Sequence, residues 1–182
     1  MKKMICAILA LSLVFALAAC GGSKPEETTA PVANIEGTME ELLNKVIEQR
    51  PVEFSGGVIP IDLTDTSEDG AWAVKSFTGL EDASQITEAA AYEPMIGSIA
   101  FSMVVLRVNE GEDAKAVAQE MKDNINTRKW MCVEAGDLQV VGYGDVVMLI
   151  MVDENFAADG ITSQAFVDAF KAVCGADLDF TI

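Results

Sequence analysis

Apolar side chains recur with the spacing of an amphipathic helix in three segments of the chain. The first segment begins after the capping residue Thr38 and ends before Pro51. The second carries its apolar stripe from Ala114 to Ile125, and the third carries one from Phe166 to Cys174. The pattern predicts a helix in each of these segments.

Three other segments have the character of strands. Ser98–Val108 is apolar on both faces, so it is predicted to be a central strand covered on both sides. Leu138–Gly142 and Val146–Val152 are separated by turn residues, which predicts a hairpin. Val58–Leu63 contains Pro60 and therefore suits at best an edge strand.

Two segments give weaker patterns. Ala71–Phe77 is predicted to be a strand, and Leu80–Ala91 a helix that ends before Pro94. Together the elements predict a single α+β domain over residues 38–182, with a mainly antiparallel sheet of three to five strands packed with helices. The helix that follows Ser98–Val108 permits one parallel crossover. A three-layer arrangement is the alternative, because that strand is apolar on both faces.

The chain begins with a different pattern. Lys2 and Lys3 precede an apolar run from Met4 to Ala19, in which Ser12 is the polar member. A helix needs about 20 apolar residues to cross a bilayer, so this run is short for a permanent anchor. Its length and flanks predict that residues 1–19 are a signal peptide.

Leu17-Ala18-Ala19-Cys20, followed by Gly21-Gly22-Ser23, resembles the lipobox of bacterial lipoproteins. That resemblance implies cleavage before Cys20 and a thioether-linked diacylglycerol on its sulfur. It places the protein on the extracytoplasmic face of the cell membrane, held by acyl chains such as palmitate. The alternative is an ordinary signal peptide with a chance cysteine. Residues 20–37 are rich in Gly, Pro, Thr and Glu, which predicts a disordered linker.

Composition excludes several classes of function. The chain of 182 residues has no histidine, so it has no Ser-His-Asp or Cys-His site and no histidine metal ligand. Its formal net charge is −17, with 12 basic against 29 acidic residues. Nucleic acid is not an expected partner, since proteins bind it largely by neutralising phosphate with Lys and Arg.

Cys132 and Cys174 are the cysteines that remain after Cys20 in the mature chain. A disulfide between them is permitted outside the membrane. The alternative is two buried free thiols, since unpaired cysteine is among the most buried residue types. Two cysteines without histidine or a CxxC motif make a poor zinc site.

Two further patterns raise the question of a metal. Asp65–Gly70 matches the first half of a calcium loop, but Ser76 stands where a bidentate Glu is needed, so a solvated loop is the expectation. Several methionines could suggest copper(I), yet most are in phase with apolar faces and are expected in the core. They are Met95, Met103, Met121, Met131, Met148 and Met151. No metal and no cofactor other than the lipid on Cys20 is predicted.

One cluster joins basic and aromatic residues. Arg128, Lys129 and Trp130, with Lys122 nearby, could hold an acidic ligand such as a carboxylate or a wall-polymer phosphate. The alternative is structural, because cations near a helix C-terminus complement its dipole and the tryptophan can cover the edge of the core.

The second half of the chain, from about Leu80, resembles a domain family of unknown function found in surface lipoproteins of Gram-positive bacteria. A predicted helix ending in Ala91–Met95 and the strand Ile99–Val108 carry the resemblance. The helix phase of Ala114–Met121, Arg128 and the stretch Gly142–Ile150 complete it. The resemblance implies no activity and identifies no functional residue.

No GxSxG, SxxK, P-loop or GxGxxG motif is present. The sequence therefore predicts a non-enzymatic binding or accessory module at the cell envelope, whose partner is an envelope protein, another envelope component or a small ligand. The alternative is a hydrolase that uses Asp and Glu side chains on an envelope polymer, because 29 acidic residues always offer carboxylate pairs.

Overall fold

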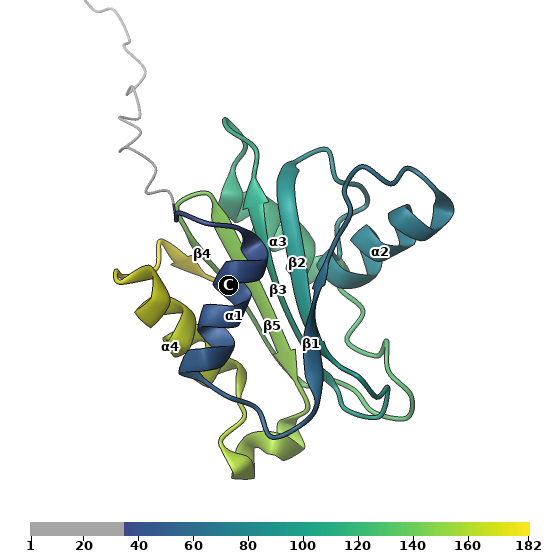
Figure 1. Ribbon diagram of the computed structural model, residues 1–182, viewed down its shortest axis with the longest axis vertical. Coiled ribbons are helices and arrows are strands. Elements are labelled where there is room, and N and C mark those ends of the chain that lie inside the picture. Colours follow the sequence, from purple (N-terminus) through teal and green to yellow (C-terminus); the bar gives the residue numbers. More distant parts are fainter. Residues whose placement is uncertain (1–34) are drawn as a thin grey trace, which may run out of the picture. The chain divides into compact units, whose positions relative to one another are not determined.

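The computed structural model describes residues 35–182, which form an open six-stranded sheet with helices on both faces (Figure 1). The strand order is β1-β2-β3-β5-β4-β6, and each neighbouring pair is antiparallel. The strands are β1 (Gly56–Pro60), β2 (Ile86–Pro94), β3 (Phe101–Val108), β4 (Asp137–Tyr143), β5 (Val146–Val152) and β6 (Phe180–Thr181). The helices are α1 (Met39–Gln49), α2 (Glu68–Thr78), α3 (Ala114–Asn124), a short 3₁₀ helix η1 (Glu154–Asp159) and α4 (Ser163–Cys174). The predicted signal peptide and residues 20–34 of the predicted linker lie outside the described residues.

Strands β3 and β5 lie at the centre of the sheet and are buried on both faces. In β3, Met103 and Val105 contribute to one hydrophobic core, and Val104 and Leu106 contribute to the other. Helices α1 and α4 cover the first core, and α2 and α3 cover the second. The α+β class and the central two-faced strand are confirmed. The sheet has one strand more than the predicted upper limit of five, and the layering is the three-layer alternative.

Helix α1 follows the sequence prediction closely. The hydroxyl of Thr38 accepts a hydrogen bond from the Glu41 amide, and the Glu41 carboxylate accepts one from the Thr38 amide, which completes a capping box. The apolar face of the helix is fully covered by the sheet and α4. Its buried members are Met39, Leu42, Leu43 and Val46.

The connection from β3 through α3 to β4 is the crossover that the sequence permitted. β3 and β4 run parallel because each is antiparallel to β5, which lies between them. In residues 35–182 no two adjacent strands are parallel. The β4–β5 hairpin then places β5 between β3 and β4, and β3 and β5 form the buried centre of the sheet.

The prediction of a strand at Ala71–Phe77 is wrong, because this segment lies within α2. Ser67 caps the helix by accepting from the Gly70 amide, and Gly79 ends it with φ +80°. The buried residues Gly70, Val74 and Thr78 are spaced four apart on one helical face. The buried positions of the segment therefore have the period of a helix and not that of a pleated strand.

The prediction of a helix at Leu80–Ala91, ending before Pro94, is also wrong, because β2 occupies residues 86–94. Alanine favours helices in isolation, but tertiary pairing overrides this preference here. β2 pairs with β1 on one side and β3 on the other. The small side chains of Ala89, Ala90 and Ala91 are buried between the helical layers. The element on which the family resemblance partly depended is therefore a strand.

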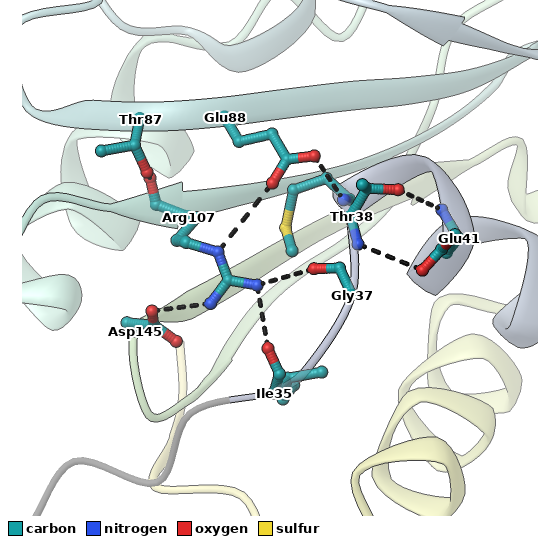
Figure 2. Close-up of polar contacts among 9 residues, drawn as sticks. Ile35, Gly37, Thr38, Glu41, Thr87, Glu88, Arg107 and Asp145 are labelled. Carbon is teal, nitrogen blue, oxygen red and sulfur yellow. Dashed lines mark hydrogen bonds and ion pairs between the residues drawn. The ribbon is translucent and has the colours of Figure 1, made fainter.

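Arg107 on β3 holds the start of the described chain against the sheet (Figure 2). Its guanidinium lies 2.7 Å from Asp145 Oδ2 and donates to the backbone carbonyls of Ile35 (2.9 Å) and Gly37 (3.1 Å). Glu88 lies 3.9 Å from the same guanidinium and accepts from the Met39 amide at 2.8 Å. Residues 35–37, which were predicted to belong to the linker, are therefore part of the folded domain.

The Arg107 contacts should contribute measurably to folding. Replacing Arg107 with Ala leaves Asp145 and two carbonyls without their donor, so we expect a loss of about 2–4 kcal/mol in the free energy of unfolding. Urea denaturation of the mature chain carrying Cys20→Ser measures it. Lys115→Ala is the control, because Lys115 is exposed and makes no ion pair among the described residues. Equal stability of the two variants would contradict the role given to Arg107.

Candidate functional site

A cleft of about 440 Å³ opens between α2 and the loop that follows α3. Its lining contains three cationic side chains and no carboxylate, in a chain with 29 acidic and 12 basic residues. The lining residues are Trp72, Lys75, Ser76, Asn124, Asn126, Arg128 and Lys129. We refer to this set as the α2–α3 cleft.

Trp72 supplies the aromatic surface of the cleft. It lies on α2, away from the buried positions of that helix, and is 66% exposed. Exposing an indole to water is unfavourable, and surface aromatics of this kind are enriched where proteins bind partners. The sequence prediction missed the exposure of Trp72 because it assigned residues 71–77 to a strand. A helix in this segment places Trp72 on the face opposite Val74.

Lys129 lies at the inner end of the cleft and its side chain is only 10% exposed. Its ammonium group is 2.5 Å from Glu93 Oε1 and donates to the Ser76 carbonyl at 3.1 Å and the Ser102 hydroxyl at 3.3 Å. It also lies 5.0 Å from the ring centre of Phe77, a cation–π distance. Burial lowers the pKa of Lys129, and the attraction of Glu93 offsets only part of that effect.

The other residues of the predicted ligand patch lie in different places relative to the cleft. Arg128 is exposed, lines the cleft and forms an ion pair with Glu134. Trp130 is half-buried and lies behind Lys129, with its ring centre 5.4 Å from the ammonium group. Lys122 is half-buried in the last turn of α3 and does not line the cleft. The structure therefore brings two of the four predicted residues into one cleft and places a third against it.

Five lining residues were missed by sequence reasoning. Three come from α2 and two from the end of α3 and the turn after it, namely Trp72, Lys75, Ser76, Asn124 and Asn126. The Asn126 side chain accepts from the Arg128 amide at 2.9 Å, which shapes this turn. A correct helix prediction for residues 68–78 would have provided the signal for the three residues of α2.

The α2–α3 cleft offers an indole face, amide groups and cationic donors. Such a combination suits a ligand whose C–H groups can pack on the indole and whose hydroxyl, carboxylate or phosphate groups accept hydrogen bonds. The cations are already paired, since Lys75, Arg128 and Lys129 contact Glu81, Glu134 and Glu93. A ligand acid group would therefore share these donors with the protein's own carboxylates.

Ser102 and Lys129 are neighbours, but they are not arranged as a nucleophile and its base. The Ser102 hydroxyl donates to Glu93 at 2.7 Å, and its side chain is completely buried on β3. A nucleophile needs a deprotonating partner and access to substrate. The hydroxyl here is directed to a carboxylate inside the core, so the group is structural.

A second cleft contains several carboxylates, the groups that a hydrolase without histidine would need. This cleft of about 580 Å³ includes Glu110, Glu112, Asp113 and Asp145. Asp113 caps α3, and Asp145 is held by Arg107. A general acid needs a raised pKa. The carboxyl pKa values that depart from the ordinary range in residues 35–182 are all lowered, chiefly by side-chain hydrogen bonds, and belong to Asp62, Asp65, Asp82 and Asp177.

The two cysteines of the domain are free thiols, so the disulfide that the sequence permitted is not formed. Cys132 is exposed in the loop after α3, in contrast to the buried thiol of the alternative prediction, and Cys174 is half-buried against the core beneath α1 and α4. Val133, next to Cys132, packs against the opposite core. Burial raises the pKa of the Cys174 thiol to about 11.

The segment Asp65–Gly70 starts a helix. The Asp65 carboxylate accepts from the Ser67 amide at 2.9 Å, Ser67 caps α2, and Gly70 lies inside that helix. No group of three or more Cys, Asp or Glu side chains suited to a metal occurs in residues 35–182. Met148 and Met151 lie in opposite cores, as their spacing on one strand predicts. Met95 and Met131, in contrast, are exposed.

Comparison with known proteins does not assign the chain to a family. No protein-family model, curated protein or solved structure matches it. The lipobox and the likeness to Gram-positive surface lipoproteins therefore stay predictions from the sequence. None of the helices in residues 35–182 is long and apolar enough to cross a membrane.

The Lys129–Glu93 pair can be tested by a double-mutant cycle. Lys129→Met leaves Glu93, whose side chain is 17% exposed, charged and without its cation, so we expect a loss of about 2–4 kcal/mol in the free energy of unfolding. The single variant Glu93→Gln leaves the Lys129 charge unpaired in the same way. The double variant Glu93→Gln, Lys129→Met should lose less than the sum of the two single variants, because neither charge remains. Urea denaturation of the mature chain gives all three values. If the free energy lost by the double variant equals the sum of the losses of the two single variants, the two residues are not coupled.

The two thiols should differ in reactivity. At pH 8 a thiol with a pKa of about 11 is only about 0.1% thiolate, so iodoacetamide should label exposed Cys132 at least about tenfold faster than Cys174. Peptide mapping by mass spectrometry separates the two sites. Equal labelling rates would contradict the burial of Cys174, and a peptide linking both residues would reveal a disulfide.

Proposed function

We propose that this protein is a lipid-anchored binding module on the extracytoplasmic face of the cell membrane. Cys20, in the sequence Leu17-Ala18-Ala19-Cys20, is the attachment site for the lipid. Attachment depends on acyl chains, because residues 21–37, which directly follow Cys20, contain one Lys and no Arg to bind anionic lipids. The strong negative charge of the chain favours a domain that stands off the membrane surface.

The α2–α3 cleft is the binding site in this proposal, and its unusual lining carries the argument. Cationic and amide donors surround an exposed indole where the lining contains no carboxylate. An acidic envelope polymer, with sugar or polyol units that carry phosphate or carboxylate groups, has the matching chemistry. Trp72 contacts the apolar face of a unit, and Arg128 contacts its acid group.

A binding role is favoured over hydrolysis by the placement of the acidic side chains. Two of the four carboxylates that line the larger cleft have structural roles, Asp113 as a helix cap and Asp145 as the partner of Arg107. The carboxylates that contact the cations of the α2–α3 cleft are all ion-paired, and they are Glu81, Glu93 and Glu134. An acid/base pair for glycoside hydrolysis requires two carboxyl groups facing one substrate bond.

The anchor is tested by changing Cys20 to Ala. We expect the protein to move from the membrane fraction to the medium or the soluble fraction, because the sulfur that carries the lipid is lost. Cys132→Ala is the matched control and should stay with the membrane. Labelling with radioactive palmitate should follow the same pattern. Retention of Cys20→Ala in the membrane fraction would overturn the proposed anchor.

The binding site is tested with poly(glycerol phosphate) and oligogalacturonate as probes. Calorimetry with the mature Cys20→Ser chain should detect one of these polymers, and Trp72→Ala should weaken its binding by about tenfold or more. Ile59→Ala is the control, because Ile59 is an exposed apolar residue on β1 outside the cleft. If neither polymer binds, or if the Trp72→Ala variant binds as tightly as the unchanged chain, the proposed ligand is contradicted.

A further inference from the structure

Three exposed apolar side chains gather at one end of the sheet. Met95 is 79% exposed, Ile96 57% and Met131 75%. The first two lie at the turn from β2 to β3, and Met131 lies in the loop from α3 to β4. The Met131 amide donates to the Gly97 carbonyl at 2.8 Å, which holds the two loops together. We call Met95, Ile96 and Met131 the distal tip.

The distal tip is supported by fixed backbone contacts. The Met95 amide donates to the Ser55 carbonyl at 3.0 Å, next to the start of β1. On the other side, the Asp153 amide donates to the Ala100 carbonyl at 2.8 Å. An ordered loop surface that keeps large apolar side chains in water is typical of an interaction site. The core beneath the tip is complete without these side chains, since none of them is buried.

The tip lies at the opposite end of the sheet from the Arg107 contacts. Phe101 is at the end of β3 near the tip, whereas Arg107 is near the other end and holds Ile35 (Figure 2). The eight residues of β3 span about 23 Å at the usual rise per residue. If the chain is anchored through Cys20, which is the proposed function and is used here for orientation alone, the domain is tethered at one end and the tip lies at the other.

The charges around the tip indicate the chemistry of its partner. Glu53 lies two residues before Ser55, whose carbonyl accepts from the Met95 amide, and Asp153 and Glu154 follow the Ala100 contact at the end of β5. None of these three acidic residues forms an ion pair among the described residues. Arg128, in the same loop as Met131, is already paired with Glu134. This acidic rim opposes contact with an anionic bilayer or with a second acidic copy of the chain. It complements an apolar recess bordered by Lys and Arg.

We propose that the distal tip is a docking surface for an envelope protein that presents an apolar recess with a basic rim. Ile96 and Met131 enter the recess, and the flanking carboxylates contact its cations. The surface is separate from the α2–α3 cleft, since no tip residue lines that cleft. The protein then has one face for an acidic ligand and one end for a protein partner.

The test uses a photo-crosslinking amino acid placed at residue 96, 131 or 116 in intact cells. Ala116 is the control because it is exposed on α3, near the end of the sheet that holds Ile35. We expect the same protein adduct from positions 96 and 131 and none from position 116. Adducts with lipid, adducts with a second copy of this chain, or identical adducts at all three positions would overturn the proposal.

The protein identified in this way is then purified and its affinity for the mature Cys20→Ser chain is measured. Ile96→Glu and Met131→Glu should each weaken binding by about tenfold or more, and Ala116→Glu should not. Raising the salt concentration should slow association, because the rim contacts are electrostatic. Equal affinity of the tip variants and the control would overturn the proposal. Neither measurement depends on the lipid or on a ligand in the cleft, so failure here is distinct from failure of the proposed function.

Discussion

Strands β3 and β5 are buried on both faces, and this burial determines where the helices must lie. All seven residues of β5 are buried, and seven of the eight residues of β3 are buried as well. Such strands are stable only if apolar helices cover each side of the sheet. This requirement places α1 and α4 on one face and α2 and α3 on the other. It also makes Arg107, the one half-buried residue of β3, available to hold the start of the domain.

The sequence was informative where local and tertiary preferences agree. Thr38 and Glu41 mark the start of α1, and the turn after Tyr143 marks the β4–β5 hairpin. It was misleading where they disagree. The alanines of β2 favour a helix locally, yet their small volume is what the closely packed layers require. The segment 71–77, predicted to be a strand, lies in the capped helix α2, where its tryptophan is exposed.

The candidate site was recovered only in part for the same reason. Arg128 and Lys129 are adjacent in sequence, so their cluster was visible without a structure. Trp72 and Ser76 lie more than fifty positions away and reach the cleft because α2 packs over the same core as α3. The pairing of Lys129 with Glu93 depends on two segments that the sheet brings together, and no local pattern records it. Sequence motifs of a membrane anchor, in contrast, are local and can be interpreted directly.

One sheet, buried on both faces, supports both the α2–α3 cleft and the distal tip. Native-state hydrogen exchange of the mature chain tests whether this sheet unfolds as a single unit. The amides of residues 103–106 and 147–150 should exchange only through global unfolding, with equal free energies on the two strands. Exchange of either strand through a smaller, local opening would show that one helical layer leaves the sheet independently and would contradict the account.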